Sequence, residues 1–210
     1  MRGLLALAVG VVVACAPDAE DARPRDTTRP TYDAETGRLQ RLTHDSDGNG
    51  VVDTWTYMDG PRTLRSELDR DEDGKIDRWE YYDDTGQVQR VGLSRANDGK
   101  ADMWAYPGAD GEIARAELAS SPDRRVDRWE WFVDGVLVRA EEDGDGDGAV
   151  DKWEVHRDGS VVSVAFDENG DGSPDRRLNY GAGGALLSIE TDPDGSGRFR
   201  KKGQVRQQPR

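Results

Sequence analysis

Five tryptophans recur along this chain at intervals of 24, 25, 25 and 24 residues, and an Asp stands two residues before each of them. They are Trp55, Trp79, Trp104, Trp129 and Trp153. The same frame continues at Asp175, with Arg177 in the tryptophan position, and ends at Arg200. A fixed period of this length indicates a repeat architecture, in which each unit buries its apolar surface only against its neighbours. The chain is therefore an array of about seven units, and the first is a half unit that starts near Tyr32.

Each unit contains two short alternating stretches joined by a turn signal. An aromatic stretch such as 79–82 (WEYY) comes first, and a stretch such as 112–118 (EIARAEL) comes second. Asp-Gly and Thr-Gly pairs between such stretches are strong short-range signals for a β-hairpin, and no part of the repeat shows the helical period. We expect an all-β fold, a repetitive antiparallel meander of about seven hairpin units forming an elongated or curled sheet. A closed propeller is disfavoured, because blades of about four strands would leave half a blade over. Trp79 and Tyr81 are two residues apart, so such pairs should share one face and form an aromatic ladder across units.

The segments that precede the tryptophans carry a second pattern. Four of them fit D-x-[DN]-x-[DN]-G-x-φ-D, where φ is apolar or Pro: the first loop (45–53), the second (69–77), the fifth (143–151) and the sixth (167–175). Ca²⁺ takes about six to eight oxygen ligands, and carboxylates on alternate residues of a tight loop converge on one point. The Gly permits the sharp turn, the seventh residue offers its carbonyl, and the closing Asp returns a carboxylate to the ion.

Oxygen ligands without Cys or His disfavour zinc and copper. The alternative is that these loops are acidic, solvated turns without a metal, but four matches at fixed spacing favour calcium. We therefore expect about four Ca²⁺ sites along one edge of the sheet. Their side-chain ligands would be Asp45, Asp47, Asn49, Asp53, Asp69, Asp71, Asp73, Asp77, Asp143, Asp145, Asp147, Asp151, Asp167, Asn169, Asp171 and Asp175.

Three further loops of the same frame have lost part of the ligand pattern. They are the third loop (94–102), the fourth (119–127) and the seventh (192–200). We expect these to be metal-free turns in the same scaffold. Arg124 and Arg125, in the fourth loop, would supply fixed positive charge where an ion would otherwise sit.

The four intact loops resemble EF-hand loops, with Glu80 and Glu154 at the twelfth position. However, Glu130 holds that position in a loop without early ligands, so this Glu does not follow the metal-binding pattern. The closer resemblance is to the calcium loops of integrin-like propeller blades and of thrombospondin type 3 repeats, which implies that the ninth-position Asp completes the site. The hairpins more loosely resemble the Tyr-Asp-Gly repeats of large bacterial surface proteins.

Residues 1–15 (MRGLLALAVGVVVAC) are predicted to be a targeting segment, with Arg2 ahead of an apolar run too short to span a membrane. The end of this segment, VVAC, resembles the lipobox of bacterial lipoproteins, which implies lipidation of Cys15. An ordinary secretory signal is the alternative. Ala16 after the cysteine favours, by analogy with Gram-negative sorting, an exported protein anchored in the outer membrane. Cys15 is the only cysteine, so internal disulfides cannot stabilise the chain.

The rest of the chain divides into three parts. Residues 16–30 are predicted to be a disordered tether, 31–196 the repeat domain, and 197–210 a basic C-terminal tail. The tail is read as a solvated end, with contact to anionic headgroups, cell-wall polymer or the protein's own acidic loops as the alternative.

Composition and the motifs that are missing exclude several classes of function. A net charge of −14 disfavours nucleic acid as a partner. His44 and His156 are predicted to be surface residues, and the chain lacks the common nucleophile, phosphate-loop and zinc-protease motifs, so we expect no enzyme. We expect a calcium-binding, lipid-anchored envelope protein that acts as a structural or adhesive scaffold for a protein or glycan ligand. The alternatives are a carbohydrate-binding module with exposed Trp and Tyr and, less favoured, an envelope hydrolase.

Overall fold

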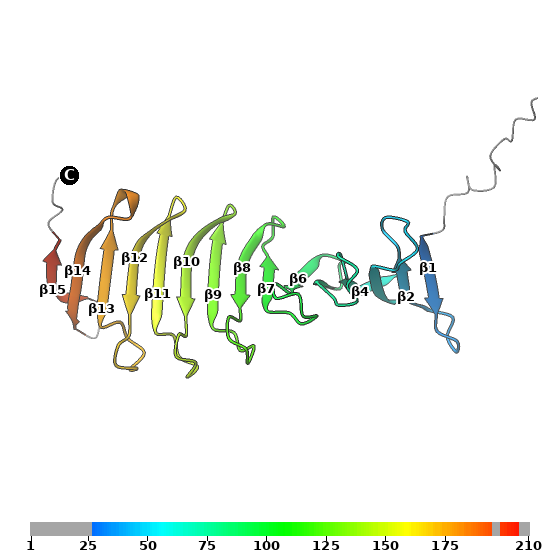
Figure 1. Cartoon of the computed structure of the whole chain (residues 1–210), viewed down its shortest axis with the longest axis horizontal. Coiled ribbons are helices and arrows are strands. Elements are labelled where there is room, and N and C mark those ends of the chain that lie inside the picture. Colours follow the sequence, from blue (N-terminus) through cyan, green and yellow to red (C-terminus); the bar gives the residue numbers. More distant parts are fainter. Residues whose placement is uncertain (1–26, 195–197, 206–210) are drawn as a thin grey trace, which may run out of the picture.

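The computed structural model describes residues 27–194 and 198–205, so the expected signal segment, Cys15 and most of the tether lie outside the described residues. Fifteen strands form one open antiparallel sheet, in which every strand pairs only with its neighbours in the sequence (Figure 1). The predicted all-β meander is confirmed, and the sheet is elongated rather than curled. A single turn of 3₁₀-helix, Ala182–Gly184, is the only helical element of the described residues.

The strands are β1 (Thr28–Tyr32), β2 (Leu39–His44), β3 (Thr54–Asp59), β4 (Arg62–Leu68), β5 (Arg78–Tyr82), β6 (Val88–Leu93), β7 (Met103–Pro107), β8 (Ile113–Leu118), β9 (Arg128–Val133), β10 (Val136–Glu142), β11 (Lys152–Arg157), β12 (Ser160–Phe166), β13 (Arg176–Tyr180), β14 (Leu186–Pro193) and β15 (Phe199–Gln204). The sheet takes in residues 28–30, at the end of the expected tether, and β15 lies within the expected basic tail.

The two kinds of connection lie along opposite edges of the sheet. Tight turns join each tryptophan strand to the next strand, and Asp134 and Gly135 show how: both have positive φ, 50° and 70°. A type I′ turn requires positive φ at both central residues, which the Asp-Gly pair tolerates. Each acidic loop joins an even-numbered strand to the next odd-numbered one. A meander reverses direction at every connection, so the acidic loops line one long edge and the tight turns line the other (Figure 1).

The face of the sheet that carries the tryptophans is a grid of aromatic and charged side chains. Trp79 pairs with Glu67 on one side and Gly92 on the other, so no two of the repeat tryptophans are on adjacent strands. Gly92 leaves room for a ring, because a Cβ there would lie 2.8 Å from the ring of Trp104. Tyr81 approaches Trp104 with a centroid distance of 5.9 Å.

Arginines fill the gaps between the rings of this face. The Arg65 guanidinium lies 3.9 Å from the centroid of Tyr57, and Arg90 lies 4.4 Å from Tyr81. Arg139 lies 4.9 Å from Trp131. The expected aromatic ladder is therefore interleaved with cation–π contacts, and the rings are half-buried beneath arginine side chains.

The opposite face has small buried side chains and a network of ion pairs. Ala116 and Ala140 are fully buried, while Val91 is 8% exposed. Glu154 accepts bonds from Arg128 (3.2 Å) and Lys152 (2.9 Å). Burial would raise the pKa of Glu154, but the bonds from Lys152, Arg128 and His156 outweigh it and lower that pKa to about 2. No large side chain of the described residues is fully buried. The sheet is therefore stabilised by the backbone hydrogen bonds between its strands and by these surface contacts, rather than by packing against a second layer.

Candidate metal centre

Backbone bonds bring the two ends of each acidic loop together. The Asp53 amide donates to the carbonyl of His44 (3.1 Å), which immediately precedes the first loop. The Asp69 amide, at the start of the second loop, donates to the carbonyl of Asp53 (2.9 Å). Bonds of the first kind close each of the first six loops, and bonds of the second kind join each of the second to sixth loops to the loop before it. The first and closing residues of each of these loops therefore lie together at the sheet edge.

Three of the four expected sites have converging carboxylates. In each group the ligand oxygens lie within 4.8 Å of one another, and each group could hold a metal ion. The first residue is buried, the third-position residue is exposed, and the closing residue is buried or half-buried. The groups are Asp45, Asp47 and Asp53; Asp69, Asp71 and Asp77; and Asp143, Asp145 and Asp151.

The first-position carboxylate organises the turn in the first and fifth loops. Asp143 Oδ1 accepts the Gly146 amide (2.8 Å), and its Oδ2 accepts the Gly148 amide (2.9 Å). Gly146 and Gly148 have φ values of 78° and 95°, which favour glycine. Asp151, at the closing position, accepts the Gly144 amide (2.8 Å). Both oxygens of the first carboxylate are thus engaged by the backbone of its own loop.

The second loop differs at this point. Asp69 Oδ2 accepts the Gly74 amide (2.9 Å), but Asp69 Oδ1 is buried without a hydrogen-bond partner. The fourth position here is Glu72 rather than Gly, and its amide leaves Asp69 Oδ1 without a donor. Asp69 is only 4% exposed, and a buried carboxylate oxygen without a donor is costly. A cation among Asp69, Asp71 and Asp77 would satisfy that oxygen, so these residues fit a metal ion.

The fifth-position carboxylates Asp73 and Asp147, expected as ligands, lie outside the converging groups of their loops. Asp147 Oδ1 accepts the Ala149 amide (2.7 Å), and Asn49 Oδ1 accepts the Val51 amide (2.7 Å). Asp73 Oδ2 accepts a bond from Lys75 Nζ (2.7 Å), and that bond lowers the pKa of Asp73. The backbone or a lysine therefore engages the fifth-position side chain in each of these loops.

The sixth loop has Asn169 at the third position, so it lacks the third-position carboxylate that completes the group in the other three loops. Asp167 accepts the Gly170 (2.8 Å) and Gly172 (2.6 Å) amides as in the first and fifth loops. Asn169 Nδ2 instead donates to Asp175 Oδ1 (3.0 Å), so an amide group engages the closing carboxylate. The remaining expected ligand, Asp171, accepts the Ser173 amide (2.9 Å).

Arginines neutralise the remaining carboxylates of the third loop. Arg95 Nε donates to Asp102 Oδ1 (3.0 Å), the closing carboxylate, and Arg124 reaches over from the fourth loop to pair with Asp98. Arg124 Nη1 also donates to the carbonyl of Lys100 (3.4 Å). Asp98 and Lys100 hold the fifth and seventh positions, which are the expected ligand positions of an intact loop. The positive charge expected from Arg124 thus lies at the neighbouring loop rather than at its own.

Side chains link the first four loops to one another along the edge. Asn49 Nδ2 donates to both carboxylate oxygens of Glu72 (2.7 and 2.9 Å). Asn97 Nδ2 donates to Asp71 Oδ2 (2.9 Å) and makes a longer bond to Asp73 Oδ2 (3.4 Å). With the pair of Arg124 and Asp98, these bonds join the first loop to the second, the second to the third and the third to the fourth.

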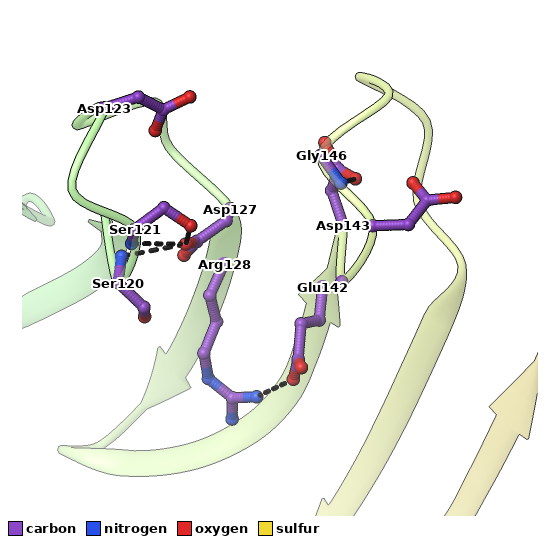
Figure 2. A pocket seen from close by; sticks show the side chains of 10 residues that line it. Ser120, Ser121, Asp123, Asp127, Arg128, Glu142, Asp143 and Gly146 are labelled. Atoms are coloured by element: carbon purple, nitrogen blue, oxygen red, sulfur yellow. Dashed lines mark hydrogen bonds and ion pairs between the residues drawn. The ribbon is translucent and has the colours of Figure 1, made fainter.

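The later loops are separated. Figure 2 shows the fourth and fifth loops facing each other across an open cavity of about 480 Å³, with Asp123 and Asp143 on opposite walls. At its base Arg128 Nη1 donates to Glu142 Oε2 (3.1 Å). Within the part of the chain that the structure describes, no side-chain hydrogen bond or ion pair joins 119–127 to 143–151, or 143–151 to 167–175.

Sequence reasoning missed the linking residues Glu72, Lys75 and Asn97. Glu72 and Asn97 stand at the fourth position of their loops, where the first, fifth and sixth loops have Gly. Both have positive φ, 57° and 49°. The available signal was a side chain at a position that is glycine in the first, fifth and sixth loops.

Comparisons with known proteins leave the family open. No family model and no curated protein matches the chain. Among solved structures, accessory secretory protein 1, 2 and 3 of Streptococcus pneumoniae aligns at 16% identity over 55% of this chain and 21% of that chain, with a TM-score of 0.39. A mutant of S. aureus TarM, in complex with fondaparinux, α-GlcNAc-glycerol and UDP, aligns at 11% identity over 44% of this chain and 20% of that chain, with a TM-score of 0.36. The chain spans about a fifth of the length of these proteins.

The described residues include no helix long and apolar enough to cross a membrane.

Proposed function

We propose that this chain is a calcium-binding repeat protein of the cell envelope that acts as a structural or adhesive scaffold. The observation that carries the proposal is the buried, unpartnered Asp69 Oδ1 inside a group of three converging carboxylates. The chain leaves that oxygen without a donor, and a cation is the partner that such a group would accept.

Calcium fits these groups better than other common metals. The ligands are carboxylates, which suit hard cations, and no Cys or His takes part. Mg²⁺ demands near-ideal octahedral geometry and retains water, whereas Ca²⁺ accepts the irregular sets of carboxylate and carbonyl oxygens that loops supply. Each bound ion would also reduce the mutual repulsion of three or more carboxylates at the sheet edge.

The shape of the molecule supports a scaffold role. Over the described residues the sheet is open and extended, and its loops lie along one long edge (Figure 1). We propose no catalytic activity. The lipid anchor at Cys15 and an outer-membrane location remain proposals that rest on the N-terminal sequence, and a protein or glycan ligand is the partner proposed for the exposed faces.

A carbohydrate-binding module is the less favoured candidate. Stacking on a sugar needs an open aromatic face, but Arg65, Arg90 and Arg139 lie over rings of this sheet. Iodide quenching of tryptophan fluorescence tests this point, since rings covered by arginine should be quenched only weakly. Strong quenching together with binding to an immobilised oligosaccharide would favour the glycan-binding alternative.

Calorimetric titration of the full chain with CaCl₂ tests the proposal directly. We expect saturable binding of several ions, with at least the three converging groups occupied, and weaker binding of Mg²⁺. Replacing the exposed third-position ligands, Asp47→Asn, Asp71→Asn and Asp145→Asn, should remove most of the binding without unfolding the sheet. No heat of binding at millimolar Ca²⁺ would refute the proposal. Separately, Cys15→Ser should abolish incorporation of labelled fatty acid in a bacterial host.

A further inference from the structure

The third loop contacts the candidate cation site of the second loop with one side chain. Asn97 stands at the fourth position of the third loop, and its Nδ2 donates to Asp71 Oδ2 (2.9 Å). Asp71 Oδ1 accepts the Asp73 amide (3.3 Å) from the other side. Asp71 is exposed, so these two bonds, rather than packing, fix the direction of its carboxylate.

A lysine of the second loop pairs with the fifth-position carboxylate, which lies outside the converging group. Lys75 Nζ contacts Asp73 Oδ2 (2.7 Å) and donates to the backbone carbonyl of Asn97 (3.2 Å). Its aliphatic stem packs on the third loop, since a Cβ at Gly99 would lie 3.2 Å from Lys75 Cβ. The Lys75 ammonium group therefore neutralises the fifth-position carboxylate, whose negative charge would otherwise attract a divalent cation.

The buried oxygen shows that this loop still lacks a ligand despite these contacts. Asp69 Oδ1 has no hydrogen-bond partner, and Asp69 is only 4% exposed. Neither Asn97 nor Lys75 contacts it. The orphaned oxygen points to a cation independently of the acidic composition of the loop.

We propose that Asn97 is a positioning residue for the cation of the second loop and that Lys75 competes with that cation; the inference rests on the proposed calcium function. Outer-sphere partners orient the ligands of metal sites and change their affinity by about 10–100-fold. The third loop, which has lost its own early ligands, thus serves the site of its neighbour.

The test isolates the second loop in the full chain. Asp47→Asn, Asp145→Asn and Asp171→Asn alter the other three loops at exposed positions and leave 69–77 intact. Tb³⁺ luminescence excited through Trp79, two residues beyond the closing Asp77, reports binding, and displacement by Ca²⁺ gives its affinity. Far-UV circular dichroism in chelator checks that every variant keeps the sheet.

Two substitutions should act in opposite directions in this background. Asn97→Gly keeps the positive φ that glycine adopts at the fourth position of other loops, and it should weaken Ca²⁺ binding by about tenfold. Lys75→Met should strengthen binding by about threefold at low salt, and the gain should disappear in about 1 M salt. Lys75→Arg, which keeps the charge, should change the affinity little.

The outcomes separate the inference from the proposed function. Absence of Tb³⁺ and Ca²⁺ binding in both the isolating background and the unmodified chain would refute the proposed function. Binding that neither Asn97→Gly nor Lys75→Met changes would refute the inference alone. Equal weakening by both would also refute it, because both residues would then act only as structural supports.

Discussion

The second and fifth loops present the same ligand pattern on different supports. DRDEDGKID (69–77) and DGDGDGAVD (143–151) both have Asp at the first, third, fifth and ninth positions. In both, the first, third and ninth carboxylates converge within 4.8 Å. They differ in charge at the second, fourth and seventh positions, where the second loop has charged side chains and the fifth has Gly or Ala; the eighth position is apolar in both.

The second loop is stabilised by side-chain hydrogen bonds to the loops on either side of it. Glu72 bonds to Asn49 of the first loop, and Asn97 of the third loop bonds to Asp71. In exchange, the turn lacks one internal bond, and Asp69 Oδ1 is left without a donor.

The fifth loop is stabilised by hydrogen bonds within its own turn and by an ion pair between the residues that flank it. Both oxygens of Asp143 accept amides of its own turn, from Gly146 and Gly148. Glu142 and Lys152, which flank the loop, pair with each other (3.1 Å) at the edge of the ion-pair network. In both loops the first, third and ninth positions bring carboxylates together, while the residues at the other positions decide how the loop is stabilised without an ion.

The largest difference should follow from replacing the first-position Asp. Asp143→Asn places an amide group against two backbone N–H donors, so it should lower the free energy of unfolding by about 1–3 kcal/mol in chelator. Asp69→Asn can keep the bond from Gly74 and adds no clash of donors, so its effect should be close to zero. Urea unfolding in the presence of chelator measures both. Equal losses would contradict the distinction between the two loops.

The second largest effect is expected from acid, which should weaken the ion pairs of Glu154 in the strand that follows the fifth loop. The pKa of Glu154 is lowered to about 2 from an ordinary value of 4.5, so its stabilisation is complete above about pH 4.5 and is lost as the pH falls towards 2. Glu154→Gln should cost on the order of 1–2 kcal/mol at pH 7, and the variant and the parent chain should converge near pH 2.

Glu80 provides the matched control beneath the second loop. Burial there opposes the bonds from Tyr82 and Arg78, which lower the pKa of Glu80. Because Glu80 has fewer cationic partners, Glu80→Gln should show a smaller dependence on pH over the same range. Parallel unfolding curves for the Glu154 variant and the parent chain from pH 7 to pH 2 would show that the network does not stabilise the sheet.

The smallest effect is expected when a side-chain contact between loops, like that of Asn97, is introduced beside the fifth loop. Gly170 holds the fourth position of the sixth loop with φ 75°, a conformation that Asn tolerates better than most residues. Gly170→Asn should place an amide beside the fifth loop, as Asn97 does beside the second, and strengthen cation binding there by about threefold. Terbium luminescence excited through Trp153 measures this. An unchanged affinity would mean that the support depends on local twist and not on the fourth position alone.

Much of the architecture could be predicted from the sequence. The period of Trp79 and its equivalents predicts the hairpin units, and the Asp-Gly pairs predict the turns, because both signals are local. Asp53, Asp77 and Asp151 lie close to the first carboxylate of their loops, because backbone pairing brings the two ends of each loop together.

The contacts between units could not be predicted in this way. Asn97 reaches Asp71, and Arg124 reaches Asp98, across neighbouring loops. Such contacts depend on the stagger and twist of adjacent strands, which the spacing within one unit does not specify. The loop pattern also did not predict that Lys75 pairs with the fifth-position carboxylate of Asp73.

Thermal unfolding of the full chain in calcium and in chelator tests the central claim most directly. An ion that binds only the folded chain stabilises it by about 2.7 kcal/mol per site at a concentration a hundredfold above Kd. We predict a large rise in Tm at millimolar Ca²⁺, a smaller rise with Mg²⁺, and a reduced rise for a chain that carries Asp71→Asn and Asp145→Asn. Superimposable melting curves in calcium and chelator would contradict the account.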